Sequence, residues 1–234
     1  MAAVSGGEYR PLYMKEDSEL TVVEDFRIDV VPVSNQQFYQ FTQTHPRWGK
    51  SRISRLFAER NYLAQWEVAA DNHWQPKTQQ THYGVVNVSW FAADAYCRAQ
   101  NKRLPTTAEW EYIARASEER ADGSSEPHYN QRILEWYAKP NLPAPIGQGS
   151  SNFWGIKDLH GLNWEWVQDF NSTMTSGESR ADSSINTDLY CAAAASGSTD
   201  PSDYAAFMRY GFRSSLKAQF TLGNLGFRCA QDMP

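Results

Sequence analysis

Short, capped helices are the feature that most limits how this chain can fold. Ser34 is followed three residues later by Gln37, and such a pair forms a capping box, in which each residue satisfies a free backbone N–H of the other at a helix start. Pro46 cannot continue a helix and disfavours helical geometry in the residue before it. We therefore predict a helix over residues 35–44, only about three turns long.

Two further helices begin at similar caps. Ser89 can cap a helix over residues 90–100, and Thr106 with Glu109 forms a second capping box that begins a helix over residues 107–117. Three short helices leave most of the 234 residues unassigned. The remainder has to form short strands, turns and irregular chain.

Runs of β-branched and aromatic residues predict short strands between the helices. We expect such strands within residues 20–33, 82–88, 208–216 and 225–230. Residues 52–66 favour one or two short helices. Residues 118–150 are rich in Gly, Ser and Pro and favour irregular structure.

The aromatic content fits a fold that stacks large flat side chains in place of long aliphatic helices. The chain has 9 Trp, 12 Tyr and 11 Phe, and 41% of its residues are hydrophobic, enough for a sizeable core. It shows no internal repeat and no clear linker. We predict one domain over residues 1–234.

The charge pattern argues against two classes of partner. The net charge is -5 and no basic run of the nucleic-acid-binding kind is present, so we expect no nucleic-acid partner. No apolar run reaches the roughly 18 residues of a membrane span, so we expect none. Residues 1–13 do not read as a signal peptide, which leaves a cytoplasmic protein or one whose leader has been removed.

Three cysteines, Cys97, Cys191 and Cys229, stand far apart in the sequence, so no Cys-x-x-Cys motif exists. One disulfide with one free thiol, or three free thiols, are both compatible with this spacing. We favour buried thiols that pack as small apolar side chains.

Four segments together resemble the formylglycine-generating-enzyme family, also called the sulfatase-modifying-factor family. They read Asp-Val-Val-Pro-Val-Ser-Asn-Gln-Gln-Phe, Val-Asn-Val-Ser-Trp with Ala-Ala-Asp-Ala-Tyr-Cys, Lys-Arg-Leu-Pro-Thr-Thr-Ala-Glu-Trp-Glu-Tyr and Asn-Leu-Gly-Phe-Arg-Cys-Ala, at residues 29–38, 86–97, 102–112 and 224–230. Residues 161–166 resemble the family's Gly-Asn-x-Trp-Glu-Trp turn. The match spans almost the whole chain.

The resemblance implies an α+β, C-type-lectin-like fold with small twisted antiparallel sheets, two or three helices and much irregular structure. It also implies oxidase chemistry: the family includes copper-dependent enzymes that convert a substrate cysteine to formylglycine, and non-heme-iron sulfoxide synthases. Members without known chemistry belong to it too.

The copper chemistry is in doubt because the enzymes' Cys-x-x-x-x-Cys pair is missing. Arg209 and Ser214 stand where the two cysteines would be. A thiolate pair suits soft Cu(I), and neither a guanidinium nor a hydroxyl replaces it. We therefore expect no formylglycine formation.

Calcium, which some family members bind, is also not expected. Leu162 replaces the family's Asn in the central turn, with Asn163 one position later, and a further Asn-Ile-Trp segment is absent. Calcium needs six or more oxygen ligands, and a leucine side chain offers none.

Two residues are candidates for a different metal site, with copper or iron as the ion. His160 precedes Gly161 in the aromatic turn, and Cys191 lies where the enzymes carry an Arg-Gly-Gly-Ser-like run. The alternatives are a structural histidine bonded to backbone, and a buried or disulfide-bonded Cys191 that could face Cys229. Ser214 and Arg209 complete the catalytic candidates.

The central turn predicts a groove built on a packed core. Trp164, Glu165 and Trp166 would line it together with Arg213 and Arg228, and either arginine could pair with Glu165. In the enzymes this groove binds peptide.

Residues 200–204 and the run Phe-Arg-Ser-Ser-Leu-Lys resemble a bacterial branch encoded beside copper nitrite reductases. We therefore expect an accessory or binding protein whose partner is a protein or peptide, such as a copper enzyme of denitrification in the periplasm. The alternative is a metal-dependent oxidase of the same family with another metal site.

Overall fold

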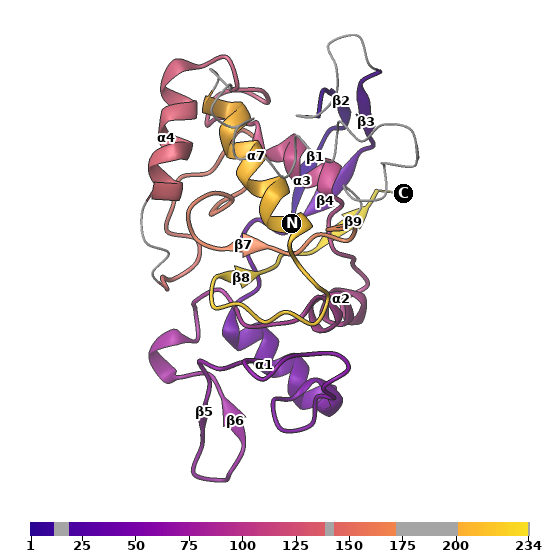
Figure 1. Cartoon of the computed structure of the whole chain (residues 1–234), viewed down its shortest axis with the longest axis vertical. Coiled ribbons are helices and arrows are strands. Elements are labelled where there is room, and N and C mark those ends of the chain that lie inside the picture. The colour runs from indigo at the N-terminus through magenta and orange to yellow at the C-terminus, as the bar shows by residue number, and fades with distance from the viewer. Residues whose placement is uncertain (12–18, 139–142, 172–200, 234) are drawn as a thin grey trace.

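The computed structural model describes residues 1–11, 19–138, 143–171 and 201–233. Small sheets and short helices build it, as expected for the α+β class (Figure 1). No helix in these ranges is both long and apolar enough to cross a membrane.

The two ends of the chain are joined in one antiparallel sheet. Strand β4 (Phe26–Ile28) lies at its centre, between β1 (Ala2–Val4) and β9 (Ala230–Asp232). Ile28 pairs with both Ala2 and Ala230, so β1 and β9 lie on either side of β4 in the same sheet.

Three two-stranded sheets complete the strand structure of the described ranges. Strands β2 (Gly7–Tyr9) and β3 (Thr21–Val23) are antiparallel, as are β5 (Glu67–Val68) and β6 (Trp74–Gln75). Strands β7 (Trp164–Glu165) and β8 (Leu225–Gly226) run parallel. This last pair places the central turn beside the C-terminal segment.

The three capped helices form where the sequence predicts them. They are α1 (Asn35–Thr44), α2 (Trp90–Ala99) and α3 (Thr107–Ala114). Both capping boxes close: Gln37 Oε1 accepts from Ser34 N at 2.8 Å and Glu109 Oε2 accepts from Thr106 N at 2.7 Å.

Two more helices occupy regions where we expected none. Helix α4 (Pro127–Ala138) lies in the stretch expected to be irregular, and α7 (Pro201–Ser214) includes much of the predicted strand 208–216. The two helices pack side by side (Figure 1). Each begins with proline, which suits the first helical turn because the N–H there needs no partner in the helix.

Two smaller predictions are also wrong. Residues 52–66 form turns instead of helix, and within residues 82–88 only Tyr83 and Gly84 make isolated bridges instead of a strand. The backbone of 82–88 bonds instead to several separate segments, as Val85 N does to Val33 O and Asn87 N does to Leu222 O.

Aromatic rings fill the core between these elements. Phe38 on α1 contacts Phe41, Trp66, Tyr96 and Phe227 at ring-centroid distances of 5.5 to 6.3 Å. Edge-to-face and stacked rings add attraction beyond the area they bury.

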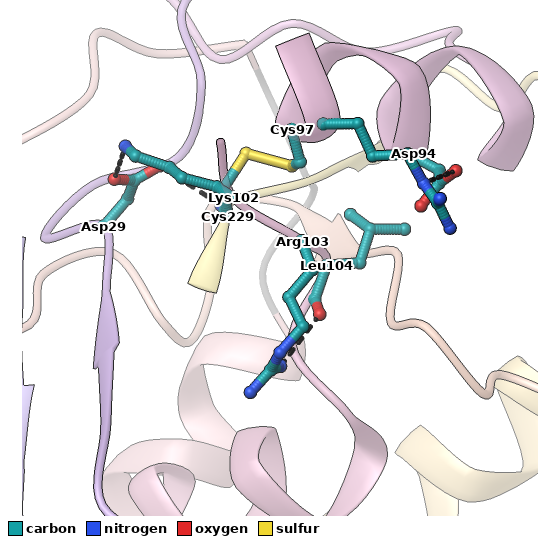
Figure 2. Close-up of a disulfide and its surroundings, with 8 residues drawn as sticks. Asp29, Asp94, Cys97, Lys102, Arg103, Leu104 and Cys229 are labelled. Atoms are coloured by element: carbon teal, nitrogen blue, oxygen red, sulfur yellow. Dashed lines mark hydrogen bonds and ion pairs between the residues drawn. A yellow bond between two sulfur atoms is a disulfide. The ribbon is translucent and has the colours of Figure 1, made fainter. Parts of the chain in front are cut away.

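A disulfide joins Cys97 on α2 to Cys229 just before β9 (Figure 2). The expectation of packed free thiols is therefore wrong for both cysteines. Cys229 has no free thiol left to pair with Cys191, which lies outside the described residues. Beside the bond, Lys102 Nζ contacts Asp29 Oδ1 at 2.6 Å. The disulfide thus joins helix α2 to the C-terminal segment. The ion pair joins the residues just after α2 to the residues just after β4.

Candidate functional site

The central turn is held by a fully buried ion pair. Glu165 on β7 accepts two hydrogen bonds from Arg228 Nε and one from Nη2, at 2.8 to 3.0 Å, and neither side chain is exposed. Trp110 Nε1 donates to the same carboxylate at 2.8 Å. The predicted partnership of Glu165 with an arginine is confirmed, and that arginine is Arg228.

Arg213 pairs elsewhere, with Glu111 on α3. Arg213 Nη1 lies 2.5 Å from Glu111 Oε1, and Arg209 contacts the same carboxylate through Nε and Nη2 at 2.7 to 3.0 Å. Burial alone would raise the pKa of Glu111, but the two guanidinium groups hold it below its usual value. Glu111 is thus ionised and bridges two arginines one helical turn apart on α7.

Arg209 and Ser214, the two residues predicted to stand in place of the family's cysteines, both have structural bonds. Arg209 is committed to Glu111, and its guanidinium also lies 5.5 Å from the Trp110 ring. Ser214 Oγ donates to Gly211 O at 2.9 Å at the end of the same helix. This hydrogen bond does not activate Ser214 as a nucleophile, because no general base contacts its hydroxyl within the described residues.

His160 is held as a neutral ring. Its Nε2 lies 3.1 Å from the Ala114 carbonyl oxygen, which can only accept, so the proton is on Nε2. The ring stacks on Trp136 at 5.7 Å and meets Trp110 edge-on at 5.9 Å. Burial and the nearby positive charge of Arg209 lower the pKa of His160 to about 3. The backbone-bonded reading of this histidine is confirmed.

Two pockets border these residues. A narrow one lies over the central turn and is lined by Trp164, Glu165, Arg213, Asn163 and Trp110 among others. A larger one, of about 130 Å³, opens beside His160 and Trp136.

Three of the five predicted groove residues line the narrow pocket, and the other two lie beneath it. Trp164, Glu165 and Arg213 line the narrow pocket, and Trp164 stacks on Phe212 of α7 at 4.5 Å. Trp166 is fully buried and donates from Nε1 to Val88 O, and Arg228 is buried beneath the turn. These last two hold the pocket's floor in place.

The residues present do not fit the copper ion that the family resemblance implies. That ion needs two thiolates, and the disulfide consumes two of the chain's three cysteines. Cys191 remains, and it lies outside the described residues. Within the described ranges no group of three or more His, Cys, Asp or Glu is placed to hold a metal, and His160 meets tryptophans.

Glu111 is the functional-site residue that the sequence analysis missed. It was assigned only to a helix, although it follows Trp110 in the most family-like segment. The available signal was the i, i+4 spacing of Arg209 and Arg213, which on a helix points two cations at one place. The strand prediction for that stretch concealed this spacing.

Comparison with known proteins identifies the family of the chain. The family model described as sulfatase-modifying factor enzyme 1-like domain matches residues 1–233. The formylglycine-generating enzyme of Streptomyces coelicolor is 30% identical over 245 aligned positions, covering 88% of this chain and 78% of the relative.

Two other relatives differ in activity. The inactive C-alpha-formylglycine-generating enzyme 2 of Mus musculus is 29% identical over 182 positions, 62% of this chain and 58% of the relative. The hercynine oxygenase of Mycolicibacterium smegmatis is 28% identical over 167 positions, 62% of this chain and 37% of the relative.

Two solved structures share the fold. PvdO from Pseudomonas aeruginosa aligns with a TM-score of 0.51 at 16% identity, covering 99% of this chain and 93% of that one. CarF aligns with a TM-score of 0.50 at 17% identity, covering 100% and 98%. At these identities the likeness concerns the fold alone.

Replacing Glu111 by Gln should strongly destabilise the protein. The change leaves two buried guanidinium groups without their counter-charge, which costs about 3–5 kcal/mol in comparable buried pairs. Urea unfolding at neutral pH measures this loss in the free energy of unfolding. Glu118→Gln, at a carboxylate that is about half exposed, is the control and should change stability by less than about 1 kcal/mol. Equal effects of the two variants would contradict a central role for Glu111.

His160 should make stability depend on pH. The folded protein keeps the ring neutral down to about pH 3, whereas the unfolded chain binds a proton below about pH 6.5. The unfolding free energy should therefore fall as pH drops from 6.5 towards 3, by up to about 1.4 kcal/mol per unit from this group. Urea titrations at several pH values should show a shallower fall in His160→Phe, which keeps an aromatic ring there. An equal slope in His160→Phe and in the unmodified chain would contradict this prediction, because it would mean that His160 has the same pKa in the folded and unfolded states.

Proposed function

Because the chain belongs to the sulfatase-modifying-factor, or formylglycine-generating-enzyme, family, we propose that it is a divergent member that binds a protein partner and does not make formylglycine. The observation that carries this proposal is the Cys97–Cys229 disulfide. It leaves one cysteine in the whole chain, so no pair of thiolates remains for Cu(I).

The state of α7 supports the same proposal. Arg209, where the enzymes' first cysteine would stand, is locked onto Glu111 together with Arg213. Placing a thiolate there would remove half of the positive charge that compensates Glu111. The helix is thus adapted to a structural ion pair.

Relatives provide a precedent. One similar protein is itself described as an inactive C-alpha-formylglycine-generating enzyme. The family's scaffold therefore persists without its oxidase chemistry in at least one relative.

The partner that we propose is a copper enzyme of denitrification in the periplasm, whose maturation this protein assists. The resemblance to the branch encoded beside copper nitrite reductases motivates the partner. The disulfide supports the compartment, because disulfides persist in oxidising spaces such as the bacterial periplasm and are rare in the cytosol.

A second candidate is a metal-dependent oxidase with another metal site, favoured by the match to hercynine oxygenase. Its cation would have to be held by Cys191 with His160 or by Asp and Glu side chains. Metal analysis of protein purified without chelators, next to a His160→Ala/Cys191→Ala variant, separates the two. Stoichiometric copper or iron that disappears in the variant would favour the oxidase.

The accessory role predicts an effect on copper loading. Copper-free nitrite reductase is incubated with limiting Cu(I), with and without this protein, and copper content and nitrite reduction are followed. We expect faster or fuller loading with the protein present, because the partner is held in a loading-competent state. Serum albumin at equal concentration is the control. No difference from albumin would overturn the accessory role.

A further inference from the structure

The loop after α1 has a charge opposite to that of the rest of the molecule. Residues 47–60 carry five Lys or Arg side chains against one Glu. The whole chain has 22 basic and 27 acidic side chains, so the remainder is left with 17 against 26, a net charge of -9. A local field of this kind attracts anionic partners to one place on an acidic protein.

The loop is fixed to a second segment by hydrogen bonds. Glu59 N donates to Gln219 O at 3.0 Å, and Gln219 Nε2 donates to Leu56 O at 3.2 Å. Lys217 is exposed two residues before Gln219, and it adds another cation to the segment that is bonded to the loop. Figure 1 places the loop beside the end of α1, at the end of the molecule away from α4.

Three of the loop's arginines are available to a partner. Arg52, Arg55 and Arg60 are exposed, and none forms an ion pair with the described residues. The other two cations have internal contacts. Lys50 Nζ donates to Leu63 O at 2.8 Å and lies over Trp74, and Arg47 lies over the Trp48 ring at 4.6 Å.

Apolar side chains are exposed among these arginines. Leu56 is 72% exposed and Phe57 is 37% exposed. Phe57 is held in place, because its ring meets Trp48 at 5.9 Å and Phe91 of α2 at 5.3 Å. An ordered apolar centre within a rim of arginines is the usual composition of a protein-binding surface.

We propose that residues 52–60 together with Lys217 form a docking surface for an acidic patch on a protein partner. The inference rests on the proposed function as a binding protein and names the chemistry of the surface it binds. A membrane surface fits less well, because the loop consists of turns and has no amphipathic helix to lie in a headgroup layer. A long nucleic acid fits less well, because the rest of the molecule repels an extended polyanion.

Peptide binding tests the proposal. The probe is a fluorescein-labelled peptide of four Asp-Glu-Phe repeats, and its anisotropy is followed with the full chain at low and at physiological salt. Binding should weaken at least about tenfold in Arg52→Glu/Arg55→Glu, because both changes put like charge against the peptide. Leu56→Ser should weaken it by a smaller factor. All three positions are exposed, so the fold should be retained.

Arg27→Glu/Arg120→Glu is the matched control, since it changes net charge equally at exposed positions outside the loop. Peptide binding by this variant should stay within about threefold of the unmodified chain. An equal loss in both double variants would overturn the docking surface. Tighter binding to a thymidine oligonucleotide of the same charge, or to vesicles of phosphatidylcholine and phosphatidylglycerol in equal parts, would overturn it as well.

The copper-loading assay keeps the two proposals apart. If the unmodified chain does not promote loading but the peptide result holds, the accessory role is wrong and the docking surface stands. If Arg52→Glu/Arg55→Glu promotes loading as well as the unmodified chain does, the accessory role stands and the docking surface is wrong.

Discussion

The buried pair between Glu165 and Arg228 is the interaction on which the rest of this structure depends. Arg228 also donates to the backbone carbonyls of residues 29, 30, 157 and 158, so a single side chain joins the N-terminal strand region, the aromatic turn and the C-terminal segment. Burying a charge is costly unless it is paired and its hydrogen bonds are made. Here the Glu165 carboxylate and all three guanidinium nitrogens of Arg228 have hydrogen-bond partners, and these bonds hold the three segments in one geometry.

A second buried carboxylate, Glu111, forms ion pairs of the same kind with Arg209 and Arg213 of α7. The two clusters share Trp110, which donates to Glu165 and faces the guanidinium groups of Arg209 and Arg213. Trp110 thus links the two buried ion-pair clusters to each other. Because Glu, Arg and Trp side chains form these contacts, this framework does not depend on a pair of free thiols.

Local signals in the sequence were sufficient for part of the fold. The capping boxes at Ser34 and Thr106 act over three residues, so both helix starts are correct. Helix α4 was not predicted, because the Gly, Ser and Pro content of residues 118–150 favoured irregular structure, and α7 was not predicted, because residues 208–216 were assigned to a strand. The Cys97–Cys229 bond spans 132 residues, and no local pattern encodes a pairing at that distance. The partner of Glu165 could be narrowed to two arginines, but the choice between them depends on which helix face α7 turns towards α3.

The number of free thiols shows most directly whether a pair of thiolates remains for copper. Protein purified without reductant can be unfolded in guanidinium chloride and treated with a thiol-reactive chromophore, and then measured again after reduction. The structure predicts about one reactive thiol per chain before reduction, from Cys191, and three afterwards. Three thiols before reduction would contradict the account, because a pair of thiolates would then remain available for copper and the argument against the family's oxidase chemistry would fail.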